Sequence, residues 1–310
     1  GVAAVDAIAA GLIDAGVPRD GVLLVQGANS AILVLFRLAC EKAGIIPAFL
    51  YVGSRRSEIE AVSRKLNPVG AVIAADGKTD LLSVYRSLGL ARNLQFLFTL
   101  EPNAFGIPSI TDLSERHVVV DFGARCIRPY EMTGIVSSSG TTGPPKCIEY
   151  SCWPRLASSR VYIERLRITE NDVILTCIPF YTGGGDMQFH ISPQIGVKFV
   201  VLSKFTPEET CRLIEREAVT GAAMVPTMIA RINGLPNLAE YDLSSLRWVV
   251  SGGGMLPYDV GGCAQTGVFC PAPRCAYLTR PASRCRAGPQ AKYALVDRTA
   301  TAATLETLTG

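Results

Sequence analysis

The chain has 310 residues, of which 48% are apolar and 18% are charged, and its formal net charge is +3. This balance is typical of a globular protein with one large or two moderate cores and argues against extensive disorder. So small a net charge, without a basic stripe that carries aromatic residues, argues against nucleic acid or a membrane surface as the main partner. The best apolar run, 31–40, is interrupted by Arg37 and is too short to cross a bilayer, so no membrane span is expected.

In chain order, short β-branched runs alternate with amphipathic stretches up to about Ser251. This pattern predicts an α/β fold with mostly parallel β-sheets flanked by helices. The predicted strands, each expected to be buried on both faces, are 22–26, 47–51, 70–74, 94–99, 133–137, 173–178, 197–202 and 247–250. The predicted helices are 29–43, 54–66, 151–166 and 206–218.

One helix start and one boundary can be read from local chemistry. Thr206 supplies a capping hydroxyl, Pro207 suits the first helical position and Glu208 faces the positive end of the helix dipole. Proline, glycine and charged residues cluster over 103–128. We expect a break between two subdomains there.

The composition changes over residues 258–310. The last fifty residues carry six Lys or Arg, two Asp or Glu, four cysteines and no isoleucine. They also lack the periodicity of the preceding chain. We expect an atypical segment, either an out-of-frame or altered terminus or a poorly ordered tail. Its cysteines include no Cys-x-x-Cys pair, so solvated thiols are expected rather than a metal site.

Cysteine and histidine usage restricts the chemistry further. The ten cysteines are scattered without a secretory signal, which favours free thiols and a cytoplasmic location. The two histidines, His117 and His190, leave little room for His-based metal sites or a Ser-His triad.

The segment Ser137 to Lys146 reads SSSGTTGPPK and follows a predicted strand. Glycine lets the backbone approach a phosphate, hydroxyl and N–H groups are donors, and the lysine adds positive charge. A triphosphate is therefore the predicted ligand, and a flexible Ser/Gly surface loop is the alternative. A Walker A loop needs Gly-Lys-[Ser/Thr] leading into a helix, whereas here two prolines precede Lys146 and Cys147 follows it.

Ser138 to Lys146 matches [Ser/Thr]-Ser-Gly-Thr-Thr-Gly-x-Pro-Lys throughout. In this the sequence resembles the adenylate-forming superfamily of acyl-CoA synthetases, aryl-acid ligases, luciferases and adenylation domains. Segments 40–59, 225–228 and 250–257 resemble, in family order, a helix-to-strand connection, a helix start at the pocket wall and the glycine-rich segment at the adenine. The resemblance implies an AMP-binding N-terminal domain of two α/β subdomains over 1–257.

The sequence IPFYTGGG, Ile178 to Gly185, falls where the family has an aromatic turn lining the acid pocket. Counted from Pro179, Thr182 occupies the position that is usually His in acyl-CoA ligases and Asp in amino-acid-activating domains. Without an acid there, nothing pairs with an α-ammonium group, and without His a standard fatty acyl substrate is disfavoured. An aryl or other small carboxylic acid is expected; the alternative is a glycine-rich loop with two core aromatics. The expected pocket residues are Phe180, Tyr181, Thr182 and Gly184.

The resemblance also implies ATP and Mg²⁺ as cofactors, a carboxylic acid as substrate and a thiol such as CoA as acceptor. The implied nucleotide-binding residues are Ser138, Ser139, Gly140, Thr141, Thr142, Gly143, Lys146, Gly252, Gly253 and Gly254. Of these, Lys146 and Thr142 are the candidates for direct participation in catalysis, because charge neutralisation and alignment dominate this chemistry. No residue is assigned as a metal ligand.

Beyond Pro257 the family motifs do not continue. The Tyr-Gly-x-Thr-Glu and Thr-Gly-Asp motifs, the hinge and the small C-terminal domain with its lysine are missing from the sequence. We therefore expect little complete turnover by this chain alone, and a non-catalytic fragment with partial nucleotide binding is the second hypothesis. An unrelated P-loop or dinucleotide-binding protein is disfavoured, because no Gly-Lys-[Ser/Thr] or G-x-G-x-x-G sits at a strand-to-helix turn.

Overall fold

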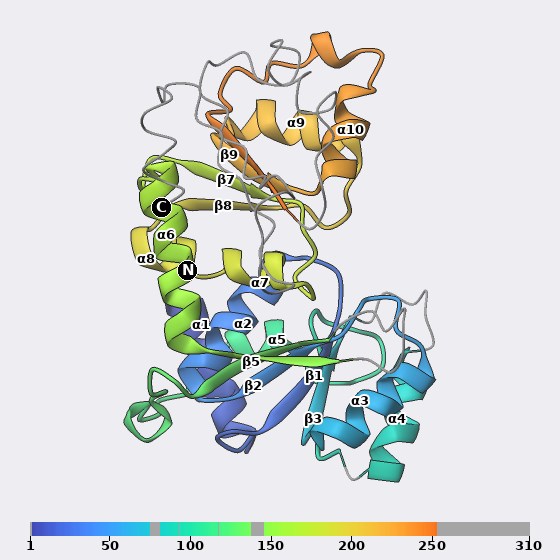
Figure 1. Cartoon of the computed structure of the whole chain (residues 1–310). Helices are drawn as coiled ribbons and strands as arrows, with labels where there is room; N and C mark the ends of the chain where they lie inside the picture. Colours follow the sequence, from blue (N-terminus) through green and yellow to red (C-terminus); the bar gives the residue numbers. More distant parts are fainter. Residues whose placement is uncertain (1, 75–80, 93, 117, 138–145, 253–310) are drawn as a thin grey trace, which may run out of the picture. The chain divides into compact units, whose positions relative to one another are not determined.

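The computed structural model describes residues 2–74, 81–92, 94–116, 118–137 and 146–252. The chain divides into two compact units (Figure 1): residues 1–159 with 179–190 form the first, and 160–178 with the chain from 191 onward forms the second. The division after Ser159 differs from the break predicted at 103–128. That segment belongs to the first unit, where Arg125 Nη1 donates to the carbonyl oxygen of Val17 at 3.1 Å. The Pro, Gly and charged residues of this segment thus belong to a connection that packs against the first unit and does not mark a boundary between units.

The first unit is built on a six-stranded sheet with the order β4-β3-β1-β2-β5-β6. The first five strands in chain order pair with one another in parallel, and β6 is antiparallel to β5. Their bounds are β1 Val22–Gln26, β2 Ile46–Phe49, β3 Gly70–Ile73, β4 Phe96–Thr99, β5 Met132–Ser137 and β6 Cys147–Ser151. The mostly parallel α/β architecture predicted from the sequence is confirmed, with β6 as an antiparallel addition that the sequence did not predict.

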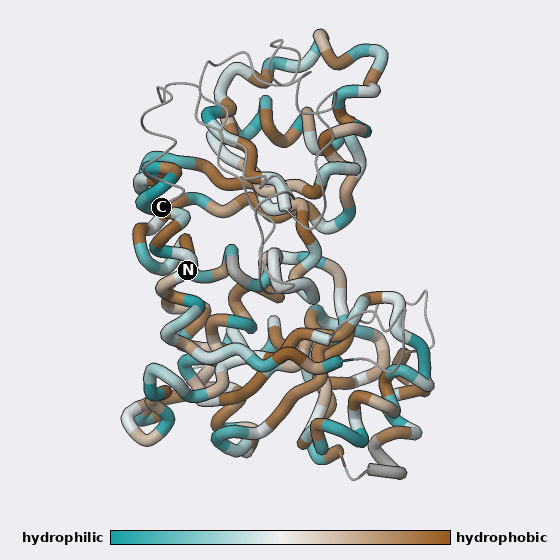
Figure 2. The backbone as a smooth tube through the Cα atoms, in the orientation of Figure 1, coloured by the Kyte–Doolittle hydropathy of each residue, from teal (hydrophilic) through white to brown (hydrophobic). Residues whose placement is uncertain are grey.

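Helices cover both faces of this sheet. Ile59 and Val62 of α3 and Tyr85 and Leu88 of α4 are buried in one cluster with residues of the strands, among them Leu24. Figure 1 shows α1, α2 and α5 on the other side, and Figure 2 shows apolar colouring along the strands between them. The helices of this unit are α1 Val2–Asp14, α2 Ala31–Ala43, α3 Arg56–Leu66, α4 Leu81–Arg92, α5 Ile110–Ser114, η1 Gly123–Arg125, the first part of α6 Cys152–Leu166, and α7 Gly183–Gln188.

The second unit has a parallel four-stranded sheet with the order β10-β9-β7-β8. Residues of α9 and α10, such as Ile214 and Ile229, form the core on one face with Leu175. Leu166 of α6 and Ile191 of α8 belong to a separate buried cluster with Trp248. The elements are β7 Val173–Thr176, α8 Ile191–Ile195, β8 Lys198–Val201, α9 Pro207–Glu217, β9 Gly221–Met224, α10 Pro226–Asn233, η2 Leu238–Glu240 and β10 Trp248–Ser251.

Local signals place several element ends. Gly44 ends α2 with φ of 64°, in the left-handed region that favours glycine, and its N–H reaches the carbonyl oxygens of Cys40 and Glu41. Thr206 caps α9, where its hydroxyl accepts from the Glu209 N–H, and Pro207 holds the first turn as predicted. The prediction that every strand is buried on both faces is wrong for β8, which starts at an exposed Lys198. Within the described residues β8 is an edge strand that pairs with β7.

Among the residues that the structure describes, no helix is long and apolar enough to cross a membrane. The apolar run that contains Arg37 lies in α2, which has 13 residues.

Candidate functional site

The predicted phosphate loop is bracketed by two described residues of the first unit. Ser138 to Gly143, with Thr142 among them, lie outside the described residues, as do both following prolines. Ser137 ends β5, and its hydroxyl donates to the carbonyl oxygen of Phe49 at the end of β2 at 3.0 Å. Lys146 directly precedes β6, which pairs with β5. The loop therefore leaves the carboxyl end of a parallel strand, the edge at which α/β sheets bind ligands.

The predicted substrate turn follows β7 and begins α7. Thr182 is the N-cap of α7: its hydroxyl accepts from the Gly185 N–H at 3.2 Å and donates to the Pro179 carbonyl oxygen at 2.7 Å. The hydroxyl of Thr182, which was predicted to line the pocket, is thus hydrogen-bonded to backbone groups of the turn itself. Gly184 lies in the first turn of α7 and is half-buried. A Cβ at Gly185 would overlap the Pro179 carbonyl group, so close packing requires glycine there.

The two aromatic residues of the turn have different surroundings. Phe180 is 1% exposed, its N–H donates to Asn29 Oδ1 at 2.9 Å, and its ring lies 4.3 Å from the Phe189 ring. This side chain packs in the interior. Tyr181 is half-buried and meets Tyr51 edge-on, with ring centroids 5.2 Å apart. Burial, with a smaller contribution from Tyr51, raises the pKa of the Tyr181 phenol.

The start of the phosphate loop and the turn contact the chain at the end of β2 and just after it. Ser137 bonds to the backbone of Phe49, whose ring stacks against Phe189 at 6.3 Å, and Tyr51 two residues later contacts Tyr181. All these residues belong to the first unit. The chain at the carboxyl end of β2 therefore contacts both Ser137, at the start of the phosphate loop, and Tyr181 of the turn.

The glycine-rich segment predicted at the adenine belongs to the second unit. Gly252 directly follows β10, whose four residues are all buried, and β10 is parallel to β9. Gly253 and Gly254 lie outside the described residues. As with Ser137, the motif begins at the carboxyl end of a parallel strand.

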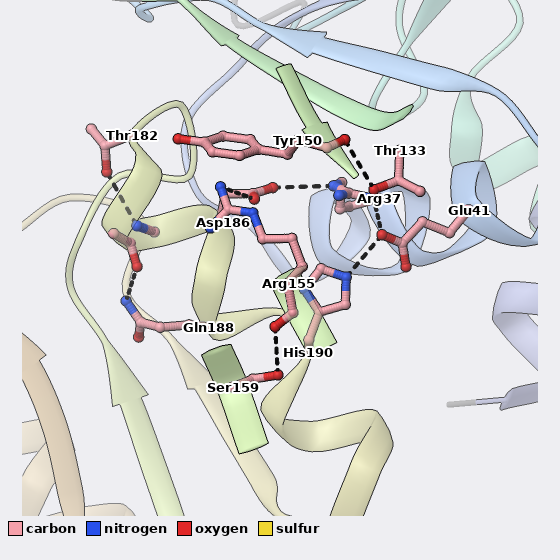
Figure 3. Close-up of polar contacts among 12 residues, drawn as sticks. Arg37, Glu41, Thr133, Tyr150, Arg155, Ser159, Thr182, Asp186, Gln188 and His190 are labelled. Carbon is pink, nitrogen blue, oxygen red and sulfur yellow. Dashed lines mark hydrogen bonds and ion pairs between the residues drawn. The ribbon is translucent and has the colours of Figure 1, made fainter. Parts of the chain in front are cut away.

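A cluster of ionisable side chains next to the turn, all buried except Glu41, was not predicted. It consists of Arg37, Glu41, Arg155, Asp186 and His190, and we call it the buried charge cluster (Figure 3). Arg37 Nη1 donates to Glu41 Oε1 at 2.8 Å, and Arg37 Nε donates to Asp186 Oδ1 at 3.3 Å. The signal in the sequence was Arg37 itself, since an arginine inside an apolar helical run requires buried partners.

Glu41 links the arginine to the histidine. Its Oε1 also lies 2.8 Å from His190 Nε2, which donates to it. Burial alone would raise the pKa of this carboxyl, but the charge of Arg37 and the hydrogen bond from His190 lower it to about 2. Glu41 is therefore an ionised group over the whole neutral range.

No group of three or more His, Cys, Asp or Glu side chains that could hold a metal ion occurs within the described part of the chain. The four cysteines of the tail lie outside that part.

The architecture matches solved structures of adenylate-forming enzymes. O-succinylbenzoate coenzyme A synthetase from Bacillus subtilis, in complex with AMP, superposes with a TM-score of 0.72 at 20% identity, over 90% of this chain and 66% of that chain. The fold is therefore that of the N-terminal part of an adenylate-forming α/β enzyme.

The sequence comparisons identify the family. A model described as AMP-binding enzyme matches residues 2–270, so the chain belongs to the AMP-binding enzyme family. The match runs past Pro257, where recognisable motifs end. A 4-coumarate–CoA ligase of Arabidopsis thaliana is 27% identical over 256 residues, 79% of this chain and 44% of the relative. The mitochondrial medium-chain acyl-CoA ligase of Mus musculus is 27% identical over 283 residues, 82% of this chain and 46% of the relative. The chain spans less than half the length of these two curated relatives.

Proposed function

We propose that this protein takes part in the ATP-dependent activation of a small carboxylic acid, with an aryl acid favoured. A substrate carboxylate oxygen attacks the α-phosphorus of ATP, the bond from that phosphorus to the bridging oxygen breaks, and pyrophosphate leaves. The acyl-adenylate then passes its acyl group to a thiol such as CoA, which loses its proton while AMP departs. The observation that carries the proposal is the meeting of the Ser137 loop end and the Tyr181 turn at the carboxyl end of β2.

The residues divide between two tasks. Lys146, with Thr142 and the other hydroxyl and glycine residues of the loop, would orient the β- and γ-phosphates and neutralise charge on the leaving pyrophosphate. Mg²⁺, bound together with the nucleotide, would supply further neutralisation of the phosphate charge. Gly252 to Gly254 would leave room for the flat adenine, because a purine can stack on backbone where side chains are absent.

The residues of the turn support the proposed class of acid. Thr182 brings no charge, and the nearest carboxylate along the turn, Asp186, is 1% exposed and paired with Arg37 and Arg155. Neither residue is in a position to pair with the ammonium group of an α-amino acid. Tyr181 offers an accessible aromatic wall next to Tyr51, which suits a flat aryl acid.

The test uses the purified 310-residue chain and a panel of non-hydrolysable acyl-adenylate analogues with aryl, aliphatic and aminoacyl groups. We expect calorimetric binding of an aryl analogue and of ATP, and a loss of about 100-fold in the affinity for ATP on Lys146→Ala. Lys204→Ala, at an exposed lysine of the second unit, is the matched control and should bind like the wild type. Absence of binding for ATP and for every analogue would refute the proposal.

The same preparation separates activation from mere binding. Acid-dependent exchange between ATP and pyrophosphate reports adenylate formation. If ATP binds but none of the free acids that correspond to these acyl groups supports exchange, the chain functions as a nucleotide-binding fragment of such an enzyme.

A further inference from the structure

The segment 179–190 has an unusual position in the chain. It belongs to the first unit, although residues 160–178 before it and the residues from 191 after it belong to the second. It carries the turn with Tyr181 and Thr182, and then α7. Both ends of the segment are joined covalently to residues of the second unit. Non-covalent contacts must therefore hold the segment in the first unit.

The helix of this segment is weak by itself. α7 has six residues and starts with Gly183, Gly184 and Gly185. Each glycine in a helix costs about 1 kcal/mol relative to alanine. An isolated helix of this length is unstable in water even with favourable residues. Its conformation must therefore come from its N-cap and from tertiary contacts.

Aromatic packing buries part of the segment but does little to fix the orientation of α7. The ring centroids of Phe180 and Phe189 lie 4.3 Å apart, and the Phe189 ring also stacks on the Phe49 ring. Rings in such contacts can slide and tilt at small cost, because several offset arrangements are similar in energy. These contacts keep the segment attached without fixing how α7 is rotated.

The buried charge cluster fixes the orientation of α7. Asp186, near the middle of the segment, is held by two arginines: Oδ1 accepts from Arg37 Nε at 3.3 Å, and Oδ2 pairs with Arg155 Nη2 at 2.7 Å. His190, at the end of the segment, donates to Glu41. Figure 3 shows the arginines approaching Asp186 from α2 and α6. The carboxylate is thus held at both oxygens, by a hydrogen bond from Arg37 and an ion pair with Arg155, and these two contacts limit its orientation.

We propose that Asp186, held between Arg37 and Arg155, is a positioning residue for the acid pocket. It fixes α7, and through α7 the turn that presents Tyr181 and Thr182 to the acid. The inference rests on the proposed function, since the turn must be the acid site for this positioning to affect substrate. The cluster sets the affinity for the acyl group and leaves the affinity for ATP nearly unchanged.

Asp186→Asn tests this, because it keeps the shape of the side chain and removes its charge. We expect amide hydrogen exchange over 179–190 to become at least 10-fold faster, while exchange in α1 and β1 is unchanged. The affinity for the acyl-adenylate analogue should fall at least 10-fold, and that for ATP less than 3-fold. Arg155→Met should act in the same direction, and Arg155→Lys, which keeps the cation, should retain part of the affinity.

The matched control is Asp172→Asn in the second unit. Asp172 is also buried, and it pairs with Arg247 at 3.3 Å. This variant loses an ion pair whose carboxylate is likewise buried, while its arginine is 43% exposed, and it should leave exchange over 179–190 at the wild-type rate. A general loss of stability would accelerate exchange in both variants alike and would overturn the proposal.

Two further outcomes are decisive. If Asp186→Asn does not fold, Arg155→Met carries the comparison; unchanged exchange over 179–190 in that variant overturns the inference. Equal losses of affinity for ATP and for the analogue also overturn it. If the wild type binds neither ligand, the proposed function fails, and the exchange measurement still decides whether Asp186 holds the segment.

Discussion

Replacing Glu41 by Gln should destabilise the first unit at neutral pH and remove part of its acid sensitivity. Arg37 and His190 both donate to Glu41 Oε1, at 2.8 Å each. The pKa of this carboxyl falls from 4.5 to about 2. At about 1.4 kcal/mol per pH unit, this corresponds to about 3 kcal/mol of folding free energy at neutral pH.

The sign follows from linkage. A lowered pKa in the folded state means that the contribution of Glu41 is fully present above pH 4.5 and is lost as the pH falls towards 2. By pH 3.5 a little under half of it should be gone. The glutamine variant cannot titrate at this position. Its free energy of unfolding should therefore depend less on pH over that range than that of the wild type.

The assay is a urea titration at pH 6 and pH 3.5, with pulsed hydrogen exchange of peptides from α2 for the first unit and from α9 for the second. Glu60→Gln is the matched control, because Glu60 pairs with Arg56 in the same i,i+4 geometry at 3.5 Å on the surface of α3. Exposed pairs of this kind contribute about 0.5 kcal/mol or less. If the wild type and Glu41→Gln lose stability in parallel between the two pH values, the reasoning about Glu41 is wrong.

Three other substitutions probe the fold and the turn. Gly221→Ala should cost the second unit about 1–3 kcal/mol in urea unfolding, because the new Cβ would overlap the Trp248 ring, and Trp248→Leu in the same chain should recover part of the loss. Tyr85→Phe should cost about 1–3 kcal/mol, because the Tyr85 hydroxyl donates to the buried Gln26 Oε1 at 2.9 Å; an unchanged midpoint would contradict this. Thr182→Val should cost about 1 kcal/mol and speed amide exchange in α7, whereas Thr182→Ser should keep the cap.

The sequence predicted the elements whose determinants are local. The strand at Val22–Gln26 has the predicted bounds, and Thr206 and Gly44 mark helix ends through a capping hydroxyl and a left-handed glycine. The strands β6 and β9 were missed. β9 reads GAAM, without β-branched residues, and is defined by its neighbours β7 and β10 on either side.

The residues of the candidate site also fall into those that local sequence predicted and those that it did not. The phosphate loop and the turn were found as motifs, because contiguous residues carry them. The buried charge cluster was missed, since Arg37 and Asp186 lie 149 residues apart and meet through the tertiary fold alone. The assignment of Thr182 to the pocket did not anticipate that its hydroxyl would cap α7, a role that any Thr before a glycine-rich helix start can take.

Gly134 in β5 has a consequence for the way this sequence can vary. The pairing of β5 with β6 shifts register between Met132 and Gly134, and a Cβ at Gly134 would come within 3.1 Å of Arg37 Nη2. The guanidinium group of Arg37 thus occupies space that a side chain on the neighbouring strand would otherwise take. The two positions form a coupled pair, so related sequences with arginine at one should have glycine at the other. Those with a shorter side chain in α2 are free to place alanine or serine in the strand.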